Sequence, residues 1–424
     1  MRGAGVFEPR AERPFRLLWA AATTSAIGSA FVPVALAFAV LGIGGTATSL
    51  GLVLLTGTIA GLLAFLAGGV WADRLSRRNL MLSADIVRLV VEALVAVLLL
   101  TRHAHIWELG AAFAITEVAS SFFGPASTAL VPEFVAAGRL QKANSLLSIS
   151  QSGSSVVGPA LSGLLVAMAG AGWAFAVDAA SFAGSAVFLL CLPALAKARP
   201  DARQGFFADL ATGWHEVTGR TWAWATLIGN TIGNMAFSVV FVLGPVLALQ
   251  RLGGASAWGL VGSGFSAGAV LGALAAVWVK ARRPIADGML ATVVCALPPL
   301  ALAARLPLYA LVVSAVIAMA GGIFLNTNWD TAIQQLIPNE VLGRFRSYDY
   351  LLAFMAMPVG LGIAGPLAGA FGAGKVLTIA GAVIVVCAVV PPVLPAVRAV
   401  VRHEDGTITG PPAAVTRARG EQEA

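Results

Sequence analysis

The segment GVWADRLSRR, residues 69–78, separates two long apolar stretches of the chain. It places one carboxylate, that of Asp73, among the guanidinium groups of Arg74, Arg77 and Arg78. The apolar stretch before it begins near residue 47, and the one after it begins near residue 80. Each is long enough for a bilayer crossing, which needs roughly 20 predominantly apolar residues. The pattern predicts two transmembrane helices joined by a short charged loop.

The composition extends this prediction to the whole chain. Of 424 residues, 58% are hydrophobic and 11% are charged, whereas soluble domains have about 45–50% apolar and 25% charged residues. This excludes a water-soluble domain, a disordered chain and a coiled coil. We expect an all-α polytopic membrane protein with twelve spans, at roughly 17–41, 47–70, 80–101, 106–129, 144–169, 173–194, 221–248, 256–279, 285–304, 306–330, 348–371 and 375–397.

The 27 lysines and arginines are unevenly divided between the predicted loops. With the N-terminus in the cytoplasm, nearly all of them fall on that side; the exceptions are Arg88 within a span and, on the other side, Arg102, Arg251, Arg305 and Lys375. Positive residues favour the cytoplasmic side, so we expect both termini in the cytoplasm and a location in the cell (inner) membrane. Basic loops facing anionic lipid also explain the net charge of +7 without nucleic acid.

Short sequence signals recur after about 206 residues. The VW pair at 70–71 recurs at 277–278, and the GP pair at 158–159 recurs at 365–366. The repeat predicts two pseudo-symmetric six-helix halves in the same orientation, which is an arrangement found in secondary transporters. We expect a cytoplasmic N-terminal segment, a first half, a linker, a second half and a disordered tail, at 1–16, 17–194, 195–220, 221–401 and 402–424.

Residues 69–78 resemble the G-x-L-A-D-R-x-G-R-R loop of the major facilitator superfamily, with Trp71 and Ser76 in place of leucine and glycine. The resemblance implies the major facilitator fold, in which this loop braces the outward-facing state. A plain basic loop would not explain the carboxylate at that spacing. We therefore predict a cytoplasmic gate that also includes the first acidic residue of the next span, and its members are Gly69, Asp73, Arg74, Arg77, Arg78 and Asp85.

A second resemblance lies in the fifth predicted span. Residues 154–163 are similar to the antiporter motif G-x-x-x-G-P-x-x-G-G of the same superfamily, with serine in place of two glycines, and an echo follows at 362–369. Small residues allow helices to approach closely, and a proline frees a backbone carbonyl. Ordinary membrane packing explains the pattern as well as antiport does. The expected helix-packing residues are Gly158, Pro159, Gly163, Gly365, Pro366 and Gly369.

Three further stretches, at 122–133, 177–182 and 335–344, narrow the resemblance. Together they look like the drug-exporter branch that contains enterobactin exporters and macrolide efflux proteins. Such members often carry an acidic residue after the glycine of the first span, whereas Gly28 is followed here by Ser29. This departure argues against a proton site on that span.

Ionisable residues inside a span are costly and usually functional. Asp85, Arg88 and Glu92 share one helix face because they are three and four residues apart. We expect Asp85 to join the gate, which leaves Arg88 and Glu92 as an inner pair that is either coupling or structural.

Glu117 lies roughly 16 Å from the outer end of its span, near the midplane. A carboxyl group there favours its neutral form, as a proton carrier requires, so Glu117 is our first candidate for proton coupling; pairing with Arg88 is the alternative. Asp178 is a further candidate, for which a structural role is favoured.

Uncharged polar residues form stripes at helical spacing on three spans. In the superfamily, the substrate cavity is lined chiefly by spans one, four, seven and ten. The cavity candidates are Ser25, Ser29, Gln151, Ser155, Asn230 and Asn234. Interhelical hydrogen bonding without a cavity is the alternative and is favoured for the serines, whereas a substrate-facing position is favoured for the asparagines and Gln151.

Neither the H-E-x-x-H metal motif nor the G-x-x-x-x-G-K-[ST] phosphate-binding loop occurs in the sequence. We therefore expect no enzyme, no catalytic residue, no metal and no cofactor. Our interpretation is a monomeric secondary exporter of small amphipathic or hydrophobic compounds, driven by proton antiport through alternating access. The alternatives are a proton-independent facilitator or importer of a polar metabolite, and a receptor or scaffold that transports nothing.

Overall fold

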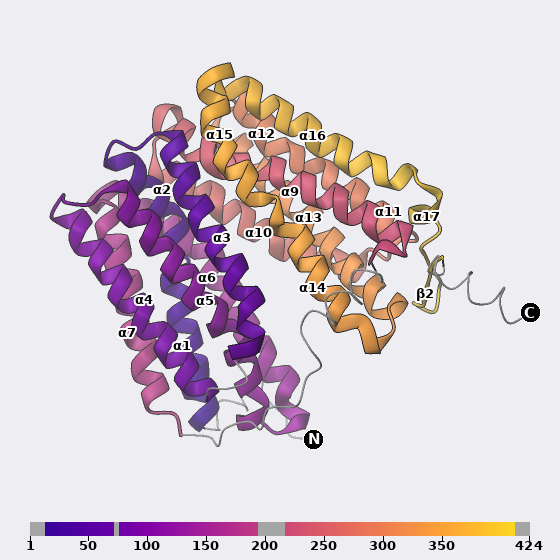
Figure 1. The fold of residues 1–424 in the computed structure, drawn as a ribbon, viewed down its shortest axis with the longest axis horizontal. Coiled ribbons are helices and arrows are strands. Elements are labelled where there is room, and N and C mark those ends of the chain that lie inside the picture. The colour runs from indigo at the N-terminus through magenta and orange to yellow at the C-terminus, as the bar shows by residue number, and fades with distance from the viewer. Residues whose placement is uncertain (1–12, 72–75, 194–216, 412–424) are drawn as a thin grey trace, which may run out of the picture. The chain divides into compact units, whose positions relative to one another are not determined.

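The structure is a computed structural model that describes residues 13–71, 76–193 and 217–411 (Figure 1). The described part consists of helices and one two-stranded hairpin. Within it, 11 helical segments are long and apolar enough to cross a membrane. The predicted third span corresponds to α4 (Arg77–Leu100), which falls outside that set; its 24 residues include Asp85, Arg88 and Glu92. The predicted all-α polytopic membrane protein is confirmed.

The chain forms two compact units. The first consists of Met1–Asp201 and Pro245–Ser263. Its helices are α1 (Arg13–Ser29), α2 (Val32–Gly42), α3 (Ala47–Trp71), α4, α5 (Ile106–Phe134), η2 (Ala137–Arg139), α6 (Leu140–Ala169) and α7 (Ala171–Leu190). Helix α4 packs against both α5 and α7, and α3 packs against α5.

The second unit consists of Ala202–Gly244 and Gly264–Ala424. Helices α9 (Thr221–Leu247) and α10 (Ala255–Trp278), with η3 (Ala248–Leu252) between them, are divided between the units. The remaining elements are α11 (Pro284–Ala291), η4 (Thr292–Ala296), α12 (Leu297–Ala303), α13 (Leu308–Leu336), α14 (Asn339–Met355), α15 (Met357–Phe371), α16 (Ala373–Val393), α17 (Pro395–Arg398), β1 (Val401–Arg402) and β2 (Ile408–Thr409).

The assignment of residues 245–263 to the first unit differs from the predicted boundary at 221. The physical reason is close packing of α10 on α6. A Cβ atom built on Gly259 would lie 2.3 Å from the Pro159 carbonyl oxygen, and one built on Gly163 would lie 2.4 Å from the Ala255 carbonyl oxygen. Glycines at the crossing let the two backbones touch.

Three predicted spans are interrupted. The first divides into α1 and α2, the ninth into α11, η4 and α12, and the eleventh into α14 and α15. The α-helix that resumes each of these spans, α2, α12 or α15, has a proline in its first two positions, such as Pro33 in α2 and Pro358 in α15. Because proline has no N–H group and clashes with the preceding turn, the helix breaks there.

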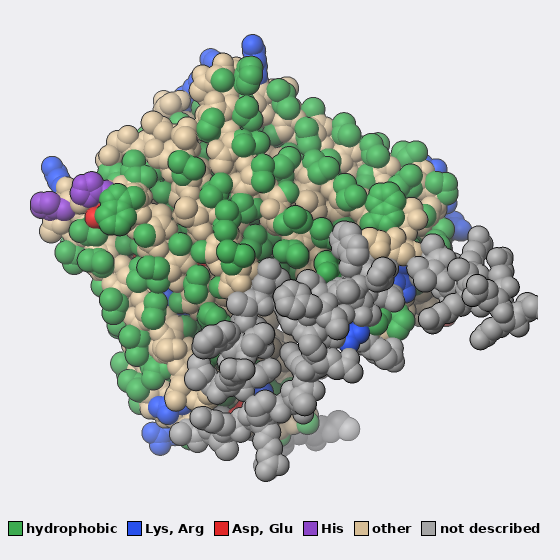
Figure 2. Space-filling view, viewed as in Figure 1, with side chains coloured by type: hydrophobic (Ala, Val, Ile, Leu, Met, Phe, Trp, Pro, Cys, Tyr) green, Lys and Arg blue, Asp and Glu red, His purple; other side chains and the backbone are tan. Residues whose placement is uncertain are grey.

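The surface of the helices is strongly apolar. Exposed fractions reach 78% for Met168, 57% for Leu94 and 54% for Val390. Figure 2 shows hydrophobic side chains spread along the visible faces of the helices, with few charged side chains among them. Exposed apolar surface on this scale is expected where lipid replaces water as the solvent.

The predicted disorder of residues 402–424 is wrong for residues 402–411. Strands β1 and β2 pair antiparallel, and the turn between them is closed by Thr407, whose hydroxyl hydrogen bond to Asp405 lowers the pKa of that carboxyl group. The Gln335 side chain accepts a hydrogen bond from the Ile408 N–H at 2.7 Å and donates one to the Gly406 carbonyl. Ile408 is buried in the same apolar core as Trp222 and Phe345. Docking on the end of α13 therefore orders this part of the tail.

Ile408→Asp is expected to undock the hairpin, because a carboxylate would replace an apolar side chain that is only 6% exposed. The loss of free energy of unfolding should be limited to that of docking the hairpin, since the rest of the unit can stay folded. Hydrogen exchange of residues 401–409 measures the effect. Thr409→Asp, at the neighbouring exposed position, is the control, and equal protection in both variants would contradict the prediction.

Candidate functional site

The described part of the predicted gate joins three helix ends. Asp73 and Arg74 lie outside the described residues, and Gly69 lies in the last turn of α3. Arg77, at the start of α4, pairs with Glu133 and donates a hydrogen bond to the Ala129 carbonyl, both on α5. The adjacent Arg78 donates hydrogen bonds of 2.8 Å to the Leu189 and Leu190 carbonyls at the end of α7. These arginines use their guanidinium groups to bind backbone carbonyls near the ends of α5 and α7.

Asp85 lies in a buried cluster, and its hydrogen bonds to other described residues go to Arg88 and Ser185 and not to a residue of the predicted gate. Its Oδ1 atom accepts a 2.5 Å hydrogen bond from Arg88, and its Oδ2 atom accepts one of 2.6 Å from Ser185 on α7. Arg88 thus pairs with Asp85 and not, as predicted, with Glu92. The Arg88 guanidinium carbon lies 4.6 Å from the ring centre of Phe123 and 4.3 Å from that of Phe182. Two aromatic faces hold the cation by cation–π attraction.

Two further acids lie around this pair. Glu92 accepts a 3.0 Å hydrogen bond from the Thr116 hydroxyl of α5. Asp178 accepts a 3.3 Å bond from Ser181 on its own helix. Both carboxyl groups are buried, and each has one oxygen without a hydrogen-bond partner among the described residues. Arg88 interacts electrostatically with both.

Glu117 lies apart from these bonded groups. A Cβ atom built on Gly61 of α3 would lie 3.4 Å from its Oε2 atom, so the carboxyl group rests against the α3 backbone. It is half-buried, and its carboxyl group has no hydrogen bond or ion pair with another described residue. Its electrostatic partner is Arg88. The alternative of a direct pair with Arg88 is therefore not realised in this structure.

The cavity candidates of the first unit occupy different environments. Ser25 is 4% exposed, Ser29 is half-buried, and Gln151 is exposed. The Ser155 hydroxyl bonds the Ser152 carbonyl of its own helix. The stripe on α6 is therefore partly satisfied within the helix.

The polar stripe on α9 stabilises a broken helix. Asn234 donates a 2.9 Å hydrogen bond to the Ala353 carbonyl, and Thr231 and Ser238 bond the carbonyls of Leu352 and Met357. These acceptors flank the break between α14 and α15, where carbonyls have lost helical partners. Asn234 thus has an interhelical role where a substrate-facing one was favoured, while the Asn230 side chain makes no hydrogen bond to another described residue.

Asn234→Ala is expected to lower the free energy of unfolding by about 1 kcal/mol, because it removes one interhelical hydrogen bond and leaves the Ala353 carbonyl unsatisfied. Asn230→Ala, one turn earlier, should change it little. Thermal unfolding of the detergent-solubilised protein compares the two. Equal melting temperatures would show that the bond to Ala353 contributes nothing.

The two predicted packing motifs differ in their surroundings. In the first, Gly158 packs against Ala30 between α1 and α2, Gly163 packs against α10, and Pro159 contacts Gly259 and Gly262 of α10. In the echo, Gly365 is buried and Pro366 lies within α15, but a Cβ atom on Gly369 would meet no atom within 4 Å. The close approach on α15 occurs instead at Gly360, against the Met235 carbonyl of α9.

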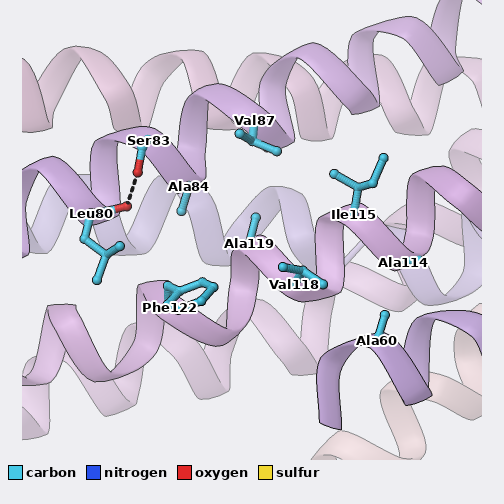
Figure 3. Close-up of a pocket in the computed structure, with 10 residues that line it drawn as sticks. All are labelled: Ala60, Leu80, Ser83, Ala84, Val87, Ala114, Ile115, Val118, Ala119 and Phe122. Atoms are coloured by element: carbon cyan, nitrogen blue, oxygen red, sulfur yellow. Dashed lines mark hydrogen bonds between the residues drawn. The ribbon is translucent and has the colours of Figure 1, made fainter. Parts of the chain in front are cut away.

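An apolar groove of about 450 Å³ lies between α3, α4 and α5 (Figure 3). Alanines 60, 84 and 119 and the ring of Phe122 help to form its wall, and the Ser83 hydroxyl is bonded to the Leu80 carbonyl. The groove therefore presents no free polar group to a ligand.

Several interactions were not predicted from the sequence. Arg346 pairs with Asp330, the Trp329 indole N–H bonds Asp349, and Arg402 bonds Asn328 at 3.1 Å. Asp330 could have been noticed because it is an acidic residue close to the end of a long predicted span. For Ser181 and Ser185 the signal was their spacing from Asp178, which places all three on one helix face.

This fold, with its membrane-length helices and its buried ionisable cluster, is that of a multi-pass membrane transporter. The chain belongs to the transmembrane secretion effector family of the major facilitator superfamily, whose sequence model matches residues 4–410. The predicted superfamily is confirmed.

Curated relatives and solved structures agree with this assignment. The chain is 30% identical to the multidrug efflux pump Tap of Mycolicibacterium fortuitum, over 85% of this chain and 90% of the relative. It is 22% identical to macrolide efflux protein A of Streptococcus pyogenes, over 91% and 96%. The fold is similar to that of the nucleoside transporter NupG (TM-score 0.69, 15% identity, 89% and 98% covered). It is also similar to a bacterial homologue of the iron transporter ferroportin (TM-score 0.68, 16% identity, 89% and 98% covered).

Proposed function

We propose that this protein is a proton-driven exporter of small amphipathic or hydrophobic compounds in the cell membrane, with both termini in the cytoplasm. The observation that carries export is the 30% identity to a multidrug efflux pump along 85% of the chain. A match of that length includes both units, so it concerns the whole transport body.

In this proposal Glu117 exchanges the proton. A coupling group has to be neutral in one state of the cycle and charged in another. Glu117 is suited to both because no hydrogen bond or ion pair to another described residue fixes its charge. The attraction of Arg88 supports the ionised form when the proton leaves. Asp73, with Arg74 and Arg77, forms the gate that latches the cytoplasmic side when the protein faces outward.

A toxicity panel in a host that lacks its own pumps tests export. Cells that express the wild type are expected to grow at higher concentrations of some amphipathic or hydrophobic compounds than cells with an empty vector. Asp73→Ala should lose most of that protection at equal expression, whereas Glu404→Ala, in the exposed turn of the hairpin, should keep it. No protection across the panel would reject export. Substrate exchange without any response to a pH gradient would favour a facilitator.

A further inference from the structure

The first membrane span is broken where two neighbouring helices touch it. Helix α1 ends at Ser29, and α2 begins at Val32 with a proline in its first turn. The Phe31 carbonyl at the break accepts a 2.7 Å hydrogen bond from Ser162 of α6. A Cβ atom on Gly158 would lie 2.3 Å from the Cβ atom of Ala30. One side of the break therefore rests on α6.

The other side of the break rests on a carboxyl group. A Cβ atom built on Gly28 would lie 2.5 Å from Asp178 Oδ1 and 2.0 Å from Ser181 Oγ, both on α7. Asp178 is 0% exposed, and in the part of the chain that the structure describes its Oδ2 atom has no hydrogen-bond partner. An ionisable group with an unsatisfied oxygen thus lies against the last turn of α1.

The charges around Asp178 do not balance if every acid is ionised. Helix α4 contributes Asp85, Arg88 and Glu92, and Glu117 of α5 lies within electrostatic reach of Arg88. The other helices packed on α7 supply no counter-charge, since α1 has only Arg13 and Arg16 near its start, α2 has none, and α6 has only Lys142 near its start.

Arg88 already neutralises Asp85 through a direct bond. Ionised Glu92 and Asp178 would therefore be two uncompensated charges in the membrane interior, each costing several kcal/mol. Protonation of both groups would avoid that cost. The Glu92 carboxyl group accepts its hydrogen bond from the Thr116 hydroxyl. For Asp178, Arg88 is the strongest attraction that favours ionisation.

We propose that Asp178 is a second proton-binding residue and that the loss of its proton loosens the break in α1. Neutral Asp178 can rest against Gly28. Ionised Asp178 requires a cation, and the Arg88 guanidinium has an unbonded Nε atom and two aromatic faces along which it can turn. The carboxylate would then move toward Arg88 and away from α1. The proton binding stands on the geometry alone, while its part in transport rests on the proposed proton-driven export.

Infrared difference spectroscopy of the purified protein, taken as the pH is raised, tests the proton binding. All variants carry Glu117→Gln, so that Glu117 does not contribute. The band of protonated carboxyl groups should decrease with rising pH, and Asp178→Asn should remove the part of that decrease that belongs to Asp178. Glu92→Gln is the matched control and should leave it. Ser181→Ala keeps the acid but removes the hydroxyl group 3.3 Å from its Oδ1 atom, so it should shift the frequency of the same band. An unchanged pH-dependent band in Asp178→Asn, or no shift in Ser181→Ala, would overturn the proposal.

Thiol labelling tests the movement of α1. In a protein whose native cysteines are replaced, Ser29→Cys should react severalfold faster with a maleimide, relative to Ile27→Cys, once the pH exceeds the value at which the infrared band falls. Asp178→Asn should abolish that increase, and a constant ratio in the wild-type background would contradict the movement. If transport by the reconstituted wild-type protein does not respond to a pH gradient, the proposed proton-driven export is wrong. The infrared and labelling measurements still decide whether Asp178 binds a proton and whether α1 moves.

Discussion

Glutamine in place of Glu117 is expected to abolish transport driven by a pH gradient while the protein stays folded. The amide has nearly the shape of the protonated acid but cannot lose a proton, so the cycle is held in one charge state. The wild-type carboxyl group has no ion pair or hydrogen bond with another described residue, and the substitution removes no bonded contact. Burying a neutral amide also costs less than burying a carboxylate.

The measurement is uptake of a fluorescent amphipathic cation into proteoliposomes with an imposed pH gradient. Glu117→Gln should show background uptake, keep substrate exchange between equal pH values, and keep the melting temperature of the wild type. Glu404→Gln, in the exposed turn of the hairpin, should retain full coupling. Gradient-driven uptake by Glu117→Gln at the wild-type rate would remove Glu117 from the proposed mechanism.

Most of the fold could be predicted from the sequence because membrane insertion is governed by length and polarity. Runs of apolar residues predicted the 11 helical segments of the described residues that are long and apolar enough to cross a membrane, and they predicted helix α4 despite its charges. The breaks were missed because a proline within an apolar run leaves the hydropathy unchanged, as at Pro358. The docked tail was missed because its sequence is polar. The polar composition of residues 402–411 predicted disorder. These residues are ordered by contacts with Gln335 and with the apolar core that contains Trp222, and both lie far from them in the sequence.

The candidate site was predictable in its residues but not in its bonds. Asp85 and Glu92 lie three and four residues from Arg88, and helix geometry allows either to pair with it. Neighbouring helices determine which of the two acids pairs with Arg88. Ser185 of α7 donates a hydrogen bond to Asp85, and Thr116 of α5 donates one to Glu92. Small hydroxyl residues are common in membrane helices, so their partners cannot be inferred from one sequence.

The same cluster yields a second large expected effect. Arg88→Leu should lower the free energy of unfolding by about 3–5 kcal/mol, because it leaves Asp85 as a buried charge without its partner. The side chains of Arg88 and Asp85 are 5% and 0% exposed, so water cannot replace the lost bond. Arg77→Leu breaks a pair whose side chains are 36% and 30% exposed, and should cost only about 0–1 kcal/mol.

The double variant Asp85→Asn/Arg88→Leu separates charge from packing. It removes both charges, so most of the stability lost in Arg88→Leu should return even though the contacts with Phe123 and Phe182 are gone. Reversible unfolding in mixed micelles gives all four free energies of the cycle. The double variant could instead be as unstable as Arg88→Leu. That result would mean that the Arg88 guanidinium stabilises the unit through its contacts with the two aromatic rings. It would also mean that Asp85 is neutral in the folded protein. Recovery would instead show that Asp85 is ionised and that Arg88 offsets its charge, which is the charge balance on which the protonated state of Asp178 depends.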